Sequence, residues 1–166
     1  VGAAFVTEAG DEIGAFRNNI AIHSIGSGEG ITDRSDLQDF GHQGVGFWLQ
    51  GSGVVVEGNI AAGHAAHGFM FYSRPLEELD LGSEPQFPAE NLFVPEIANG
   101  RDSVPVTDLP ILEFRDNVAY ASIEGVNIRY HLEKAKHDVR GSIQGLTLWN
   151  NRTGMNVYYS RNLDVD

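Results

Sequence analysis

The chain has 166 residues, a formal net charge of −12 and no cysteine. This length fits one domain, and the acidic balance argues against nucleic acid, whose phosphates need a basic surface, and against an anionic membrane. Without cysteine the chain has neither a disulfide scaffold nor a thiolate metal site. No apolar run reaches 18 residues, so we expect no membrane insertion.

The first predicted element is a strand over residues 1–8, and its apolar alternation returns four more times along the chain. Equivalent runs begin at Phe5, Phe47, Phe69, Val126 and Met155. The step from Phe47 to Phe69 is 22 residues, a period typical of one coil of a parallel β-helix, and the longer steps add insertions. We therefore expect an all-β, right-handed parallel β-helix of about five coils, formed as a single domain by residues 1–166.

The alternation also assigns each side chain in these runs to a face, because successive strand residues point to opposite sides. The inward pairs predicted to form the core are Phe5/Thr7, Phe47/Leu49, Phe69/Phe71, Val126/Ile128 and Met155/Val157. The outward pairs are Val6/Glu8, Trp48/Gln50, Met70/Tyr72, Asn127/Arg129 and Asn156/Tyr158.

A second pattern recurs beside these runs: an apolar residue, two polar or small residues, Asn, a β-branched residue and Ala. Its copies begin at Phe16, Val56 and Phe114 and contain Asn19, Asn59 and Asn117. We expect the first and third copies to lie in strands over residues 15–24 and 111–122. Asn suits turns because it bonds its own main chain, and stacked asparagines bond one another, so these predict a structural ladder.

Two insertions interrupt the predicted coils, at residues 25–43 and 74–110. The first is rich in acidic residues and glycine, which is typical of a solvated loop. The second contains all six prolines together with many apolar residues. Long excursions of this kind are usually functional or mobile. Its apolar content predicts that it packs onto the helix and walls a groove beside the outward residues.

The outward residues carry the strongest functional signal. A strip of aromatic, amide and charged groups is expected from Trp48, Gln50, Met70, Tyr72, Arg129 and Tyr158. The apolar faces of sugar rings pack on exposed aromatic rings, and their hydroxyls bond polar side chains. The strip therefore predicts polysaccharide binding, and the alternative is that the insertion covers Trp48 and Tyr72.

Carboxylates gather around the first turn. Glu8 and Glu12 are candidates for a general acid and base, and Asp11 and Glu12 are candidate calcium ligands. The pair His64 and His67 is interpreted as surface or loop histidines, because zinc needs three or four convergent ligands.

The segments 2–22 and 54–72 resemble the parallel β-helix region, with PbH1-type repeats, of a known family. This is the family of cell-surface hyaluronidase and cell-migration-inducing, hyaluronan-binding protein, together with its bacterial relatives. The matching residues are Glu8, Gly10, Glu12, Gly14, Phe47, Trp48, Asn59, Ala61, Ala62, Gly63, Gly68 and Phe69. Ala9 and Ala15 stand where the family usually has Asp and Asn. The resemblance implies an extracellular or cell-surface protein whose β-helix meets a glycan, with calcium-dependent depolymerising activity.

Three functions follow as hypotheses. The first is a polysaccharide-interacting β-helix segment of a secreted or surface polysaccharide-active protein. The second is a structural or adhesive rod segment with no ligand, and exposure of Trp48 separates these two. The third is a calcium-dependent glycan hydrolase or lyase. Because a β-helix normally carries caps at its ends, we also expect this chain to be a fragment, with further domains in the parent chain.

Overall fold

The computed structural model describes residues 2–27, 43–74 and 84–166. It confirms an all-β protein built from parallel sheets. The first sheet has the order β1-β4-β7-β12-β15 (Phe5–Thr7, Phe47–Leu49, His67–Tyr72, Glu124–Arg129 and Thr153–Tyr158). The second has the order β16-β13-β10-β5-β2 (Leu163–Val165, Gly141–Gln144, Phe114–Arg115, Val54–Glu57 and Gly14–Arg17). The third has the order β14-β11-β6-β3 (Thr147–Trp149, Val118–Tyr120, Ile60–Ala62 and Ile20–Ile22).

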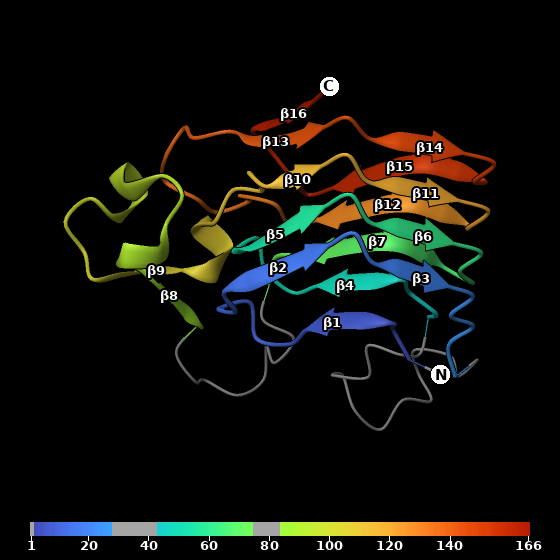
Figure 1. Ribbon diagram of the computed structural model, residues 1–166. Coiled ribbons are helices and arrows are strands. Elements are labelled where there is room, and N and C mark those ends of the chain that lie inside the picture. The colour runs from blue at the N-terminus through green and yellow to red at the C-terminus, as the bar shows by residue number, and fades with distance from the viewer. Residues whose placement is uncertain (1, 28–42, 75–83) are drawn as a thin grey trace.

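The chain visits these three sheets in rotation. After β1 in the first sheet come β2 in the second and β3 in the third, and the same sequence follows from β4 and from β12. Figure 1 shows the strands of successive rounds stacked on one another, from β1 near the N-terminus to β13, β14 and β16 near the C-terminus. Segments far apart in the sequence therefore lie side by side on each face.

The predicted alignment of the alternating runs is confirmed in the first sheet. Phe5 pairs with Phe47, Phe47 with Phe69, Phe69 with Val126, and Val126 with Met155. The inward side chains join the main core, and the rings of the first two pairs stack at 4.7 and 4.8 Å. Val157 is 46% exposed although its position is inward, because β15 is the outermost strand of this sheet.

The strands predicted over 15–24 and 111–122 are each two strands in different sheets. A bend separates β2 from β3, and another separates β10 from β11. At each bend the residue before the recurring Asn has a left-handed backbone: φ is 55° at Asn18, 64° at Gly58 and 55° at Asp116. Asn, Asp and Gly tolerate this conformation best, so the bend belongs to that residue and leaves the following Asn free to point inward.

The asparagine ladder itself is present. The side-chain oxygen of Asn59 accepts the Asn19 backbone N–H at 3.0 Å, and that of Asn117 accepts the Asn59 backbone N–H at 2.9 Å. The amides of Asn59 and Asn117 donate to the Phe16 and Val56 carbonyls, each at 2.8 Å. Both side chains are fully buried. The ladder thus satisfies backbone groups where the chain leaves one sheet for the next.

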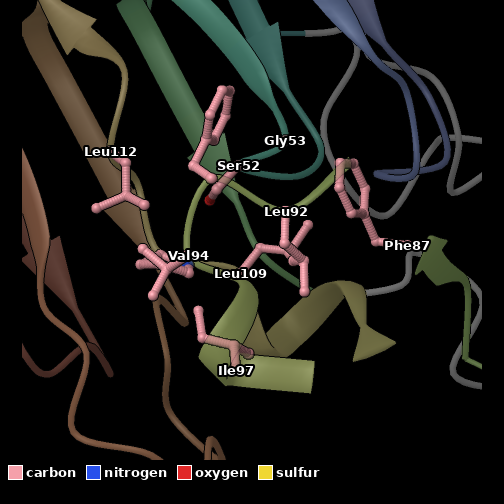
Figure 2. A pocket seen from close by; sticks show the side chains of 10 residues that line it. Ser52, Gly53, Phe87, Leu92, Val94, Ile97, Leu109 and Leu112 are labelled. Carbon is pink, nitrogen blue, oxygen red and sulfur yellow. The ribbon is translucent and has the colours of Figure 1, made fainter. Parts of the chain in front are cut away.

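The described part of the second insertion, 84–110, has a small core of its own. It contains an antiparallel pair, β8 (Gln86–Pro88) and β9 (Ser103–Pro105), and three 3₁₀ turns, η1 (Ala89–Asn91), η2 (Pro95–Ala98) and η3 (Val106–Asp108). Figure 2 shows Phe87, Leu92, Ile97 and Leu109 around one pocket with Ser52, Gly53 and Leu112, which lie just before strands β5 and β10. The insertion therefore packs onto the sheets, as its apolar residues predict. Most of the first insertion, 28–42, lies outside the described residues.

None of the helical segments in the described ranges is long and apolar enough to cross a membrane.

Candidate functional site

The candidate site lies on the outer face of the first sheet, where the sequence places the binding strip. The register sets Val6, Trp48, Met70 and Asn127 in one row. Two residues further on, Tyr72, Arg129 and Tyr158 form a second row. The predicted residues thus lie on one face of the first sheet, although they are far apart in the sequence, from β4 to β15.

The strip is divided between a covered half and an exposed half. Trp48 is 5% exposed, Gln50 2% and Met70 1%. Trp48 and Met70 form a small apolar cluster with Val45, and the indole N–H donates to Gln50 Oε1 at 3.1 Å. The side-chain amide of Gln50 in turn donates to the Arg74 carbonyl. The sequence left open whether Trp48 is exposed or covered, and in the structure it is covered: the indole packs against Val45 and Met70 and its N–H is bonded to Gln50.

The other half is half-buried to exposed and contains more aromatic residues than the sequence predicts. We call it the tyrosine–arginine surface and define it as Tyr72, Arg74, Arg129, Tyr130, Tyr158 and Tyr159. The rings of Tyr130 and Tyr159 stack at 5.4 Å with 9° between their planes, and Tyr72 meets Tyr130 edge-on at 5.4 Å. Tyr158 is 40% exposed and Tyr159 69%. Aromatic surface thus continues from β7 to the residues that follow β15.

Two guanidinium groups are held against these rings. The Arg74 guanidinium carbon lies 3.9 Å from the centre of the Tyr130 ring, and that of Arg129 lies 5.4 Å from the Tyr158 ring. Arg74 Nε also donates to Glu133 at 3.1 Å. Cation–π contact and an ion pair together restrict the arginine rotamers, which lowers the entropy that binding would otherwise cost.

A polar network occupies the start of the same strands. His67 Nδ1 lies 2.9 Å from Glu124 Oε2, and the amides of Asn127 and Asn156 donate to the same carboxylate. Asn127 Oδ1 accepts from Arg129 Nε at 3.2 Å, which links this network to the tyrosine–arginine surface. The network fixes Arg129 and supplies a hydrogen-bonding end to an otherwise aromatic face.

Sequence reasoning missed Tyr130, Tyr159 and the His67–Glu124 pair. The signal was present in the repeat. Tyr130 and Tyr159 each stand four residues after the aligned positions Val126 and Met155, and His67 and Glu124 each stand two residues before theirs. Extending the alignment beyond the inward residues in both directions finds all four.

Among the carboxylates of the first turn, Glu12 bonds the backbone of its own turn. Glu12 accepts backbone N–H groups from Glu8 at 2.5 Å, Ala9 at 2.9 Å and Gly10 at 2.8 Å. Burial opposes ionisation of Glu12, but these backbone hydrogen bonds outweigh it and lower its pKa. A lowered pKa disfavours the proton that a general acid must carry, so the structure gives Glu12 the role of closing its turn.

The same bonds bear on calcium. The Glu12 oxygens that a cation needs already accept N–H groups, and Asp11 and Glu8 are exposed side chains. Across the described ranges no three acidic or histidine side chains converge in a way that holds a metal ion. Asp11 and Glu12 are therefore not part of such a group in the described ranges.

The two histidines interpreted as surface residues are buried, His64 at 2% and His67 at 7% exposure. His64 Nδ1 accepts the Ser24 backbone N–H at 3.1 Å, which extends side-chain bonding between rounds to a second corner. Burial lowers the pKa of His64 to about 4, with a smaller contribution from nearby His23. His64 is thus a neutral structural residue.

Comparison of the chain with family models, with curated proteins and with solved structures finds no match.

Proposed function

We propose that the chain is a right-handed parallel β-helix segment that interacts with polysaccharide, in a protein of the cell exterior or surface. Support for the helix comes from the rotation of the chain through three parallel sheets and from the in-register rows on each face. A solenoid of this kind presents equivalent positions at the strand spacing, which is about 4.8 Å. A repeating polymer matches such a periodic face better than a compact ligand does.

The observation that carries the proposal is the tyrosine–arginine surface. Tyr158 and Tyr159 are exposed at the end of the outer face, and the guanidinium groups of Arg74 and Arg129 are already positioned beside the rings. Rings offer apolar contact to the faces of sugars, while guanidinium and amide groups donate to hydroxyls or carboxylates. Both kinds of contact occur together on this surface.

The test is binding of Tyr159→Ala to a panel of acidic and neutral polysaccharides, measured by affinity electrophoresis with and without calcium. Removing one exposed ring from a stack is expected to weaken binding about fivefold, since an aromatic contact contributes about 1 kcal/mol beyond its area. Trp149→Ala is the matched control, because Trp149 is 53% exposed but lies on the third sheet.

The competing function is a structural or adhesive rod, and the burial of Trp48, Gln50 and Met70 favours it. If no polysaccharide retards the wild-type chain, the rod replaces the binding segment. If Tyr159→Ala and Trp149→Ala reduce binding equally, the tyrosine–arginine surface is not the binding site. Activity as a glycan hydrolase or lyase ranks third, because Glu12 is committed to its turn.

A further inference from the structure

A groove opens on the second sheet, away from the tyrosine–arginine surface. It is lined by Gly14 and Ala15 of β2, by Gly53, which precedes β5, and by Val55 of β5, and its volume is about 360 Å³. Ile13, Arg17, Asn91 and Phe93 also line it. The insertion thus borders a groove beside β2 and β5, which is not the groove predicted beside Trp48 and the other outward residues. This volume falls in the range of roughly 300–1,000 Å³ that small-molecule sites occupy.

The wall of the groove is held in place by the insertion's own core. Leu92 is 9% exposed and lines the apolar pocket shown in Figure 2, together with Phe87 and Gly53. Its neighbours Asn91 and Phe93 line the groove, and Phe93, which also borders the pocket of Figure 2, is 47% exposed. An aromatic ring carried by a buried neighbour is a preorganised contact, so little ordering entropy opposes binding.

Three kinds of group converge in the groove. Phe93 supplies an aromatic ring, Asn91 supplies an amide, and Arg17 supplies a guanidinium whose Nε donates to Glu57 at 3.2 Å. In the described ranges, no other side chain bonds the Asn91 amide or the terminal nitrogens of Arg17. A ring for an apolar face and donors and acceptors for adjacent hydroxyls are what a sugar unit requires.

Charge decides which sugars fit. Glu57 forms ion pairs with both Arg17 and Arg115. Hydrogen bonds from Arg115, which has the larger effect, and from Arg17 lower the pKa of the Glu57 carboxyl. The charge of Arg17 is therefore offset by an ionised neighbour, within a chain whose net charge is −12. An anionic sugar gains little from such a paired arginine and is repelled by the whole molecule, whereas an uncharged sugar is not.

We propose that this groove is a second carbohydrate subsite, which holds a short segment of an uncharged sugar chain through Phe93, Asn91 and Arg17. The inference rests on the proposed function, because it assigns a substrate class to a second face of the same polysaccharide-binding segment. Two separate subsites on one rod also raise the avidity for a long polymer, provided that the polymer spans both.

The experiment is calorimetric titration of the full chain with cellohexaose, xylohexaose, maltohexaose and chitohexaose. At least one hexasaccharide binds the wild type, Phe93→Ala weakens that binding about fivefold, and Ala15→Trp, which fills the groove from an exposed position, abolishes it. Trp149→Ala leaves hexasaccharide binding unchanged, because Trp149 lies on the third sheet and is not part of the groove.

The proposal is overturned if none of the four probes binds, or if Phe93→Ala and Ala15→Trp both bind like wild type. Tighter groove-dependent binding of a carboxylated hexasaccharide overturns the assignment to uncharged sugars. The two proposals fail separately. If Tyr159→Ala loses binding to long polymers but no hexasaccharide binds the wild type, only the groove proposal fails. If a hexasaccharide binds in the groove but Tyr159→Ala binds long polymers like wild type, only the proposal for the tyrosine–arginine surface fails.

Discussion

At the scale of single residues, the buried asparagines are the positions where one side chain bonds several backbone groups. Asn59 accepts the Asn19 N–H, donates to the Phe16 carbonyl and meets the Asn117 side chain. Replacement by Ala leaves a buried donor and a buried acceptor unpaired, which costs about 1–3 kcal/mol for each group. Asn59→Ala is therefore expected to lower the free energy of unfolding by about 3 kcal/mol, measured by urea denaturation.

The matched control is Asn91→Ala. Asn91 is half-buried at the end of η1, and its side-chain amide makes no hydrogen bond within the described residues. This change is expected to alter the free energy of unfolding by less than about 0.5 kcal/mol. Equal losses in the two variants would show that the ladder contributes no more than a surface amide does.

At the scale of elements, the contact between the insertion and the stacked sheets depends on one glycine. A Cβ added at Gly53 would stand 2.4 Å from Phe87 Cε2 and 3.0 Å from Phe87 Cζ. Phe87 is 1% exposed, so its ring has no free space to enter. Gly53→Ala is expected to displace β8 and destabilise the insertion by about 1–3 kcal/mol, and limited proteolysis within 84–110 measures this as faster cleavage.

Gly154→Ala provides the comparison, because the nearest atom to its added Cβ is Leu148 Cδ1 at 3.5 Å, an ordinary contact. Its cleavage pattern is expected to match wild type. Unchanged cleavage in Gly53→Ala as well would mean that the stability of the insertion does not depend on the close packing of Phe87 against Gly53.

The elements also show what the sequence predicts and what it leaves undetermined. Alternation aligned Phe5, Phe47 and Phe69 correctly, because a period of two survives in each short strand and sets the register of inward side chains. The bends inside 15–24 and 111–122 were missed, since a left-handed residue interrupts the strand without changing its composition. Burial of Trp48 was undetermined, because alternation gives the direction of a side chain but not what covers it.

At the scale of the whole molecule, two neutral histidines lie inside the fold. His131 is fully buried: its Nε2 accepts the Ile111 N–H at 3.1 Å, and its Nδ1 lies 2.9 Å from the Arg161 carbonyl. Burial lowers its pKa to about 4, with a smaller contribution from His137. His64 has the same direction of shift, to about 4. In the unfolded chain both return to ordinary values near 6.5.

Acid should therefore destabilise this protein well above the pH at which carboxylates titrate. Between about pH 6.5 and pH 4 the unfolded chain binds these protons and the folded chain does not, so the free energy of unfolding falls as pH decreases. Each histidine contributes on the order of 3 kcal/mol to this fall. The lowered pKa values of Glu12, Glu57 and Asp164 act only at lower pH, where their stabilisation is lost.

Urea denaturation at intervals from pH 8 to pH 4.5 measures this slope. His131→Gln, which keeps a polar side chain at the same corner, is expected to lower stability at pH 8 and to flatten the slope between pH 6.5 and 4.5. His137→Gln leaves both buried rings in place and is expected to keep most of the slope. A wild-type free energy of unfolding that stays constant across this range would mean that His64 and His131 take up protons in the folded state as readily as in the unfolded chain. Their burial would then not govern acid stability.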